Sequence, residues 1–344
     1  MAEAKLLLKV DDVKKHFPIT RGVFKKVVGF VKAVDGVSFS INSGETVGIV
    51  GESGCGKTTV ARIIMGAYPP TSGNVWFQPP NGEPMVDLVH IDPEEMRSLR
   101  RNIQMVFQDP FASLNPRMTV REIIAEPLIV NKVARGRELE DRVRELVELV
   151  GLQVQHLNRY PHAFSGGQRQ RISIARAMAL YPSLLVADEP TSALDVSVQA
   201  QIINLALEIQ DRLGLAYLFI SHDLGLIRHF SKTIVIMYVG RVVEKAPAEP
   251  LFARPRHPYA EALMSNVPTT RPELLGRKLI LRGEPADPIN PPAGCPFHPR
   301  CLYAEDICAQ IVPPLAEVEP EHFSACHFSS SLNLTGCDAL GCAI

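Results

Sequence analysis

The fold is decided by the stretch Gly51-Glu-Ser-Gly-Cys-Gly-Lys-Thr-Thr59, which has the spacing G-x-x-x-x-G-K-T. A compact apolar run, residues 45–50, precedes it, and the helix-forming run VARIIMGA follows it. A glycine-rich loop between a strand and a helix lets successive backbone N–H groups face one anion, and the helix adds its positive end. The sequence therefore predicts a loop that binds phosphate groups.

Two side chains of this loop have an expected role in nucleotide binding. Lys57 should reach the β and γ phosphates, and the hydroxyl of Thr58 should ligate magnesium. The candidate nucleotide-binding residues of the loop are Ser53, Gly54, Cys55, Gly56, Lys57, Thr58 and Thr59. The alternative is a mere glycine turn between strand and helix, and the correctly placed Lys-Thr pair argues against it.

A second apolar run, residues 184–187, ends in the acidic pair Asp188 and Glu189. The carboxyl end of a strand is where an open α/β sheet presents its site. Asp188 suits a magnesium ligand, and Glu189 could polarise a water molecule as general base for attack on the γ phosphate. Alone, the pair would be interpreted as solvated acids at a strand end. The glycine loop changes that interpretation.

The rest of the chain is typical of a globular α/β protein. Its 344 residues favour two domains, and 46% hydrophobic residues with a net charge of -1 give no indication of a nucleic-acid partner. The first 240 residues alternate β-branched runs with amphipathic helices, which predicts a largely parallel sheet. Residues 32–42 and 71–77 indicate a small antiparallel subdomain, and residues 118–150 a helical insert. The apolar runs are too short to span a bilayer, so we expect any membrane role to come through partners.

A second glycine-rich helix start lies between the two phosphate motifs, in the sequence FSGGQRQR of residues 164–171. Ser165 is a natural N-cap, and Gly166 and Gly167 allow close backbone approach to an anion. Here the chain closely resembles the ATP-binding cassette (ABC) ATPases, whose signature LSGGQ has the form FSGGQ. The resemblance implies a P-loop NTPase (RecA-like) core with an antiparallel β subdomain and a helical signature subdomain. It also implies a head-to-tail dimer, in which Ser165, Gly166, Gly167 and Gln168 close over ATP bound to the partner.

The resemblance assigns roles to further residues near the phosphate site. Gln108, in MVFQDP, matches the loop glutamine that contacts magnesium and the attacking water. Ser192 and Asp195, in TSALD, match the loop that crosses the dimer interface. His222 follows the strand-like run of residues 217–220 and matches the switch histidine that contacts the γ phosphate. A histidine after a strand is weak evidence by itself, so this assignment depends on the other motifs.

The adenine-stacking position is assigned to Phe17, in VKKHFP, where the family places an aromatic side chain. Residues 18–30 resemble an insertion, and Phe24 within it is an alternative. No catalytic position departs from the family pattern, so we expect an active ATPase that uses ATP and Mg²⁺.

Longer stretches narrow the resemblance to the oligopeptide and dipeptide importer branch. They are VFQDPFASLNPRMTV, LDVSVQAQIINL, RHPYAEALMSNVP and GEPADPINPPAGCPFHPRC, the last in a distinctive C-terminal extension. Coverage runs from about Leu6 to Phe328. It implies a nucleotide-binding domain over residues 1–265, with its helical subdomain at about 109–170, and an importer-type extension over 266–328. The tail, residues 329–344, has no counterpart.

The extension is rich in proline and holds four clustered cysteines: Cys295, Cys301, Cys308 and Cys326. Four thiolates suit either a 4Fe-4S cluster or a tetrahedral zinc site. The spacing lacks the C-x-x-C pairs of zinc ribbons, and members of this importer branch carry an iron–sulfur cluster at such cysteines, so the resemblance favours iron. His298, His322 and His327 lie nearby and leave mixed ligation open. We expect a structural role, because no redox substrate site accompanies the cysteines.

The resemblance implies a peripheral subunit at the cytoplasmic face of a bacterial or archaeal cell (inner) membrane. Its expected partners are two transmembrane permease subunits, a second homologous ATPase subunit and, indirectly, an extracytoplasmic substrate-binding protein. This branch usually pairs two different ATPase subunits, which favours a heterodimer over a homodimer. Di- or oligopeptides are the expected cargo, with oligosaccharides or nickel as alternatives.

Two other classes of protein remain as hypotheses. A soluble cassette ATPase that acts on DNA ends would carry a long coiled coil between glycine loop and signature, and one that acts on ribosomes usually carries two cassettes. This chain has neither feature. An iron–sulfur redox enzyme would need a substrate pocket near the cysteines, for which the sequence gives no sign.

Overall fold

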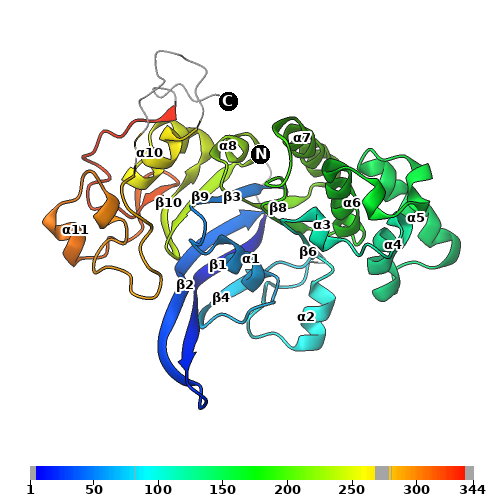
Figure 1. Cartoon of the computed structure of the whole chain (residues 1–344), viewed down its shortest axis with the longest axis horizontal. Coiled ribbons are helices and arrows are strands. Elements are labelled where there is room, and N and C mark those ends of the chain that lie inside the picture. The colour runs from blue at the N-terminus through cyan, green and yellow to red at the C-terminus, as the bar shows by residue number, and fades with distance from the viewer. Residues whose placement is uncertain (1–4, 81, 268–278, 280, 338–344) are drawn as a thin grey trace.

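The main sheet has eight strands, in the order β11-β12-β10-β9-β3-β8-β7-β6 (Figure 1). The computed structural model describes residues 5–80, 82–267, 279 and 281–337. Five neighbouring strands run parallel: β9 (Thr233–Tyr238), β3 (Thr46–Val50), β8 (Ala216–Ser221), β7 (Leu184–Asp188) and β6 (Ile103–Val106). Every residue of β3, β7 and β8 is buried, as expected for strands covered on both faces. The predicted α/β fold with a largely parallel sheet is confirmed.

Alternate side chains of these strands enter two separate hydrophobic cores. On β8, Leu218 and Ile220 pack with helix α1 (Lys57–Ile64), while Phe219 packs on the opposite face. That opposite face is covered by three helices: α6 (Gly166–Met178), α7 (Val196–Leu213) and α8 (Leu224–Phe230). The sheet is therefore the middle layer of the molecule, and its carboxyl edge carries the loops considered below.

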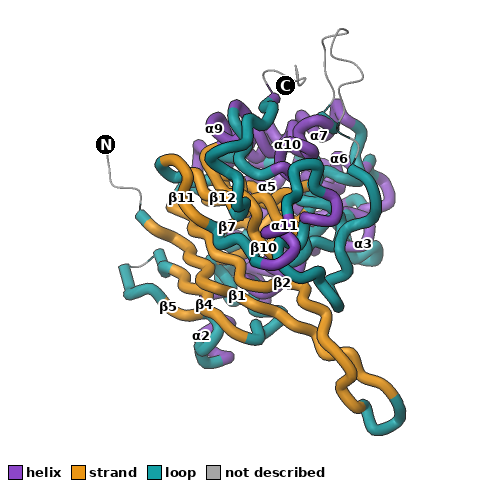
Figure 2. Tube along the Cα trace, turned by 90° about the vertical axis from the view of Figure 1, so that its left-hand side faces the viewer, coloured by secondary structure: helices purple, strands orange, loops and turns teal. Residues whose placement is uncertain are grey.

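The second sheet is antiparallel, with the order β2-β1-β4-β5. Its strands are β1 (Leu6–Arg21), β2 (Lys26–Asn42), β4 (Ser72–Phe77) and β5 (Val86–Asp87), followed by helix α2 (Pro93–Leu99). The predicted antiparallel subdomain is thus present. The insertion-like residues 18–30 form the outer part of the β1–β2 hairpin, which projects from the body (Figure 2).

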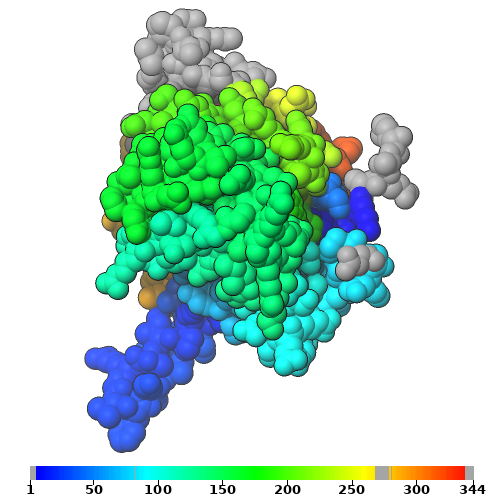
Figure 3. Space-filling model, turned by 90° about the vertical axis from the view of Figure 1, so that its right-hand side faces the viewer, coloured from blue at the N-terminus to red at the C-terminus, as the bar shows by residue number. Residues whose placement is uncertain are grey.

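The helical region follows β6 and ends in α6. It contains α3 (Pro110–Ser113), α4 (Val120–Val130), α5 (Gly136–Leu149) and the 3₁₀ turns η1 (Val154–Asn158) and η2 (Pro161–Ala163). A capping box formed by Thr119 and Glu122 begins α4. This region forms much of the face shown in green in Figure 3, in agreement with the predicted helical insert.

The C-terminal part contains more regular structure than its proline content indicates. β10 (Arg241–Pro247) is followed by two helices, α9 (Ala248–Ala253) and α10 (Pro258–Ser265). The extension contains η4 (His298–Arg300), α11 (Asp306–Gln310), β11 (Ala316–Glu319) and β12 (His322–Ser324). β12 pairs antiparallel with β10, so the extension widens the main sheet.

The described part of the tail also packs on the core. Leu334 and Cys337 are buried, and the backbone N–H of Thr335 donates to Glu261 Oε1 at 2.7 Å. Of the helices described, none has the length and apolar character that crossing a bilayer requires.

Candidate functional site

The phosphate loop connects β3 to α1 and can only be built with glycine at its end. Gly56 has a φ of 107°, and a Cβ there would lie 2.2 Å from the carbonyl oxygen of Ala33. α1 begins at this glycine without a side-chain cap, so its first N–H groups keep their capacity to bind an anion. The Lys57 Nζ donates to the carbonyl oxygens of Gly51, at 2.7 Å, and Glu52, at 3.1 Å.

An open pocket of about 230 Å³ lies at this loop. The residues lining it are Ala33, Ser53, Gly54, Gly56, Lys57, Thr58, Thr59, Gln108 and Glu189. All but Ala33 were named as site residues from the sequence, and Ala33 lies in no recognisable motif. Cys55 lies within the loop but its side chain is buried. Burial raises the pKa of its thiol, which keeps that thiol neutral.

The predicted magnesium ligands meet at the carboxyl end of β7. The Thr58 hydroxyl donates to Asp188 Oδ1 at 3.1 Å, so a hydroxyl oxygen and a carboxylate lie together. Burial raises the pKa of Asp188, and the hydrogen bond from Thr58 opposes this shift only in part. Hard oxygen ligands of this kind are the ones magnesium prefers, and the residues therefore fit the ion.

Two candidate catalytic side chains, those of Gln108 and His222, contact the carboxylate of the third, Glu189. Gln108 Nε2 donates to Glu189 Oε2 at 2.9 Å, and His222 Nδ1 lies 3.3 Å from the same oxygen. Glu189 has a φ of 47°, a left-handed conformation that costs a residue with a Cβ about 1–2 kcal/mol. Its backbone N–H donates to the Ile220 carbonyl oxygen at 2.9 Å and helps to hold this conformation. Strained backbone of this kind is concentrated at functional sites.

The signature residues lie elsewhere on the same chain. Ser165 caps α6, because its hydroxyl accepts from the Gln168 N–H and the Gln168 side chain accepts from the Ser165 N–H. A Cβ on Gly167 would lie 2.4 Å from the Val198 side chain, so only glycine lets α6 begin this close to α7. Ser165, Ser192 and Asp195 are exposed, and none of the signature residues lines the phosphate pocket.

Phe17 is half-buried on β1 and contacts Tyr68 instead of the pocket. Their rings meet edge to face with centroids 5.5 Å apart, and Lys15 Nζ lies 5.1 Å from the Phe17 ring. The alternative, Phe24, is 97% exposed at the hairpin tip. The adenine-stacking assignment therefore stays a prediction.

A second open pocket, of about 430 Å³, lies between the sheet and the helical region. It is lined by side chains of β6, α4 and α6 together with Met65 and Phe107. Phe107 immediately precedes Gln108 and is 48% exposed, and Val130 at the end of α4 is 71% exposed. This groove joins the surface of the helical region to the loop that carries Gln108.

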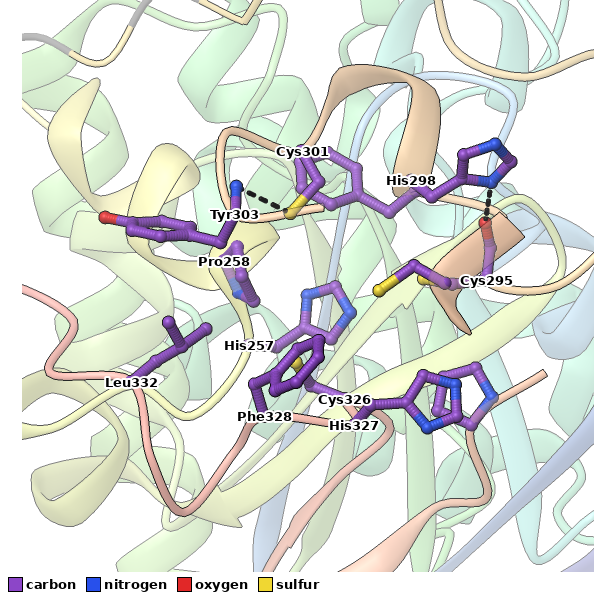
Figure 4. A pocket seen from close by; sticks show the side chains of 13 residues that line it. His257, Pro258, Cys295, His298, Cys301, Tyr303, Cys326, His327, Phe328 and Leu332 are labelled. Carbon is purple, nitrogen blue, oxygen red and sulfur yellow. Dashed lines mark hydrogen bonds between the residues drawn. The ribbon is translucent and has the colours of Figure 1, made fainter. Parts of the chain in front are cut away.

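A third pocket, a small cavity of about 20 Å³, is lined by all four predicted cysteine ligands (Figure 4). Cys295 and Cys301 flank η4, Cys308 lies in α11, and Cys326 follows β12. The same four residues are free thiols. Separate short elements thus bring four thiols to one largely apolar cavity.

Burial controls the chemistry of this cysteine pocket. It raises the pKa of the Cys301 thiol to about 12 and that of Cys326 to about 11, and it also raises the pKa of Cys295. A backbone N–H, that of Tyr303, donates to Cys301 Sγ at 3.4 Å. Neutral thiols of this kind ionise when they ligate a metal.

The arrangement differs from a site for a single ion. Nowhere in the described ranges do three or more His, Cys, Asp or Glu side chains stand close enough together to hold one metal ion. His322 is paired with Glu244 at 2.7 Å, while the His298 and His327 rings contact backbone carbonyl oxygens. The four thiols thus line one small cavity, and none of the three nearby histidines is directed to them as a further ligand.

Comparisons with known proteins agree with these observations. Residues 34–192 match the family model "ABC transporter", and residues 243–308 match "Oligopeptide/dipeptide transporter, C-terminal region". The chain is 51% identical to the oligopeptide transport ATP-binding protein AppF of Bacillus subtilis, over 96% of this chain and 99% of AppF. It is 45% identical to the dipeptide transport ATP-binding protein DppF of Haemophilus influenzae, over 93% of this chain and 96% of DppF.

Solved structures give the same fold. A dimeric ATP-binding cassette, MJ0796, in a post-hydrolysis state with ADP and phosphate, matches with a TM-score of 0.61 and 30% identity. The match covers 71% of this chain and 99% of that one. CbiO1 of Clostridium perfringens, part of an ABC transporter complex, matches with a TM-score of 0.61 and 26% identity, over 72% of this chain and 91% of CbiO1.

Proposed function

Because this chain belongs to the family of ABC transporter ATP-binding proteins of the oligopeptide and dipeptide type, we propose that its ATPase activity drives peptide uptake. Relatives that match nearly their whole length carry oligopeptide or dipeptide transport in their names. Oligosaccharides or nickel remain the alternative cargoes, since no described feature of this subunit contacts a cargo.

ATP binds at the phosphate loop in this proposal. Lys57 leaves the loop carbonyls for the β and γ phosphates, and the loop N–H groups with the start of α1 hold the phosphate oxygens. Thr58, Asp188 and Gln108 would ligate magnesium, which when bound neutralises charge on the phosphates. Phe17 would contact the adenine.

Hydrolysis depends on Glu189 as general base. Its carboxylate takes a proton from the water that attacks the γ phosphate, while Gln108 orients that water. His222, 3.3 Å from the same carboxylate, holds the γ phosphate during the step. The Gln108 and His222 side chains both already contact one carboxylate oxygen of Glu189.

A nucleotide-sandwich dimer completes the site. The exposed signature, with Ser165, Gly166, Gly167 and Gln168, contacts ATP held by the partner ATPase, and Ser192 and Asp195 lie at the interface. Support comes from the separation of the signature from the phosphate pocket in one chain. We favour a heterodimer with a homologous ATPase subunit.

The groove beside Gln108 is the proposed docking site for the two transmembrane permease subunits. It carries exposed apolar side chains, including Phe107 and Val130, next to a catalytic loop. A permease segment seated there would transmit ATP binding to the membrane, and the substrate-binding protein would act on the far side. The chain would lie peripherally at the cytoplasmic face of the cell membrane.

The cysteine pocket is proposed to hold a 4Fe-4S cluster through Cys295, Cys301, Cys308 and Cys326, with zinc as the alternative. The cluster, when bound, would cross-link the extension. The proposal is supported by the four free thiols that line one cavity and by the resemblance of this extension to the importer branch. The same cysteines tie η4, α11 and β12 together, which suits a structural staple.

The convergence of Gln108, Glu189 and His222 beside the phosphate loop carries the proposal. Replacing Glu189 by glutamine keeps the size of the side chain but removes the base. The Glu189→Gln variant should bind ATP with unchanged affinity and lose turnover, measured by nucleotide titration and phosphate release. Normal turnover by this variant would contradict the assignment.

A further inference from the structure

The phosphate loop carries one side chain that is held by the C-terminal extension. Arg300 donates through Nη1 and Nη2 to the two carboxylate oxygens of Glu52, at 2.7 and 3.0 Å. Glu52 directly follows Gly51 in the loop, and Arg300 directly precedes Cys301. A two-point Arg–carboxylate pair fixes orientation as well as distance.

This pair is largely withdrawn from solvent. The Arg300 side chain is 7% exposed and that of Glu52 is 29% exposed. Arg300 Nη1 also lies 3.4 Å from the Tyr238 hydroxyl oxygen, and the Tyr259 hydroxyl accepts from the backbone N–H of Glu52 at 2.9 Å. Glu52 is therefore held through both its side chain and its backbone.

The same residue holds the lysine that is expected to reach the phosphates. Lys57 Nζ donates to the Glu52 carbonyl oxygen at 3.1 Å and to that of Gly51 at 2.7 Å. A change in the position of Glu52 would move these two carbonyl oxygens. It would thus alter the positions of Lys57 and of the loop N–H groups before a nucleotide binds.

The extension contacts the nucleotide pocket at a second point. The Lys32 backbone N–H donates to the Pro288 carbonyl oxygen at 3.0 Å, and the next residue, Ala33, lines the pocket. The Ala286 N–H also donates to the Tyr238 hydroxyl at 3.3 Å. The extension thus contacts both the loop and the strand that faces it.

Arg300 is in turn placed by the cysteine pocket. It ends η4, the turn between Cys295 and Cys301, where the Arg300 N–H donates to the Phe297 carbonyl oxygen at 3.0 Å. The Phe297 ring packs against Tyr259, with centroids 5.3 Å apart. The backbone that carries the guanidinium thus lies in the short turn between these two cysteines.

We propose that Arg300 is a positioning residue for ATP binding, which holds the phosphate loop through Glu52 and links the cysteine pocket to nucleotide affinity. This rests on the proposed role of the loop in binding ATP. Arg300 touches no nucleotide itself and acts only through Glu52. The C-terminal extension then contributes to the nucleotide site, because one of its side chains sets the position of the phosphate loop.

The test compares Arg300→Gln, Glu52→Gln and the double variant in the full chain. The readout is the dissociation constant of a fluorescent ATP analogue, together with KM and kcat for ATP hydrolysis. Each single variant should bind on the order of tenfold more weakly, as when a residue that supports a ligand-binding group is lost. KM for ATP should rise with little change in kcat. The double variant should bind the ATP analogue no more weakly than the single variant that has the lower affinity.

Arg256→Gln is the matched control. Arg256 forms another Arg–Glu pair between core and extension, with Glu319, and its side chain is 11% exposed. That pair does not contact the phosphate loop, so its loss should leave nucleotide affinity unchanged. An equal loss of affinity in Arg256→Gln would mean that general loosening of the extension is responsible, and would overturn the proposal.

Two further variants keep the test decisive if Arg300→Gln does not fold. Arg300→Lys keeps the charge but not the two-point contact, and should lie between wild type and Glu52→Gln in affinity. Cys301→Ser should weaken nucleotide binding as Arg300→Lys does, with no further loss when the two are combined. Unchanged affinity in these variants, or additive losses, would overturn the proposal, whereas a wild type that binds no ATP would refute the proposed function instead.

Discussion

Replacing Gly56 by alanine should remove most of the ATP affinity while the fold persists. A Cβ at this position would lie 2.2 Å from the Ala33 carbonyl oxygen, far inside the 3.0 Å below which such contacts essentially never occur. Ala33 lines the nucleotide pocket, so either the loop or this strand must move by most of an ångström. Misplacement of about 1 Å at a site costs on the order of 100-fold, or about 2.8 kcal/mol.

Gly214→Ala separates this collision from the cost of the backbone conformation. Gly214 has a φ of 64° at the end of α7, and a Cβ there would meet no atom within 4 Å. Both variants pay about 1–2 kcal/mol for a left-handed residue with a Cβ. Only Gly56→Ala should also lose nucleotide affinity.

The assay is a titration with a fluorescent ATP analogue, with thermal unfolding measured on the same preparations. We expect both variants to lose stability, Gly56→Ala more than Gly214→Ala because of the added collision, and a loss of affinity in Gly56→Ala alone. ATP binding by Gly56→Ala within about threefold of wild type would refute the steric reasoning.

Three other predictions concern different parts of the chain. Burial alone would raise the pKa of Asp35, but the hydrogen bonds and charges of Arg241 and His16 together outweigh it and hold that pKa below 3.8. The resulting stability is complete above pH 3.8 and is lost as the pH falls through the lowered value, so Asp35→Asn should flatten acid unfolding followed by circular dichroism. Val130→Asp, in the groove, should block co-purification with the permease subunits while ATP binding persists; Val23→Asp, at the exposed hairpin tip, should not. Anaerobically purified wild type should contain about four irons per chain and Cys301→Ser should lose them; one zinc without iron would contradict the cluster.

Most of the phosphate site could be predicted from local sequence. Lys57 and Thr58 lie in the loop that follows β3, and Asp188 ends β7; the carboxyl ends of parallel strands meet at one edge of a sheet. Glu189 and His222 directly follow β7 and β8, but His222 could be named only through its resemblance to the switch histidine of the family. The structure places all of them around one pocket or at its edge.

The parts that could not be predicted depend on pairing between distant residues. β11 and β12 are four and three residues long, and their pairing requires the free edge of β10. Glu52 and Arg300 are 248 residues apart, and although each lies within a recognisable motif, neither motif indicates that the two side chains pair. The packing of Phe17 on Tyr68 is of the same kind, since it depends on how the second sheet meets α1.

The central claim is that ATP hydrolysis in this pocket drives peptide uptake. The most direct measurement records both processes in vesicles that contain the chain with its permease subunits, partner ATPase and substrate-binding protein. We predict peptide uptake that requires ATP and is lost, together with hydrolysis, in Glu189→Gln. Uptake that continues in this variant, or hydrolysis to which peptide makes no difference, would contradict the account.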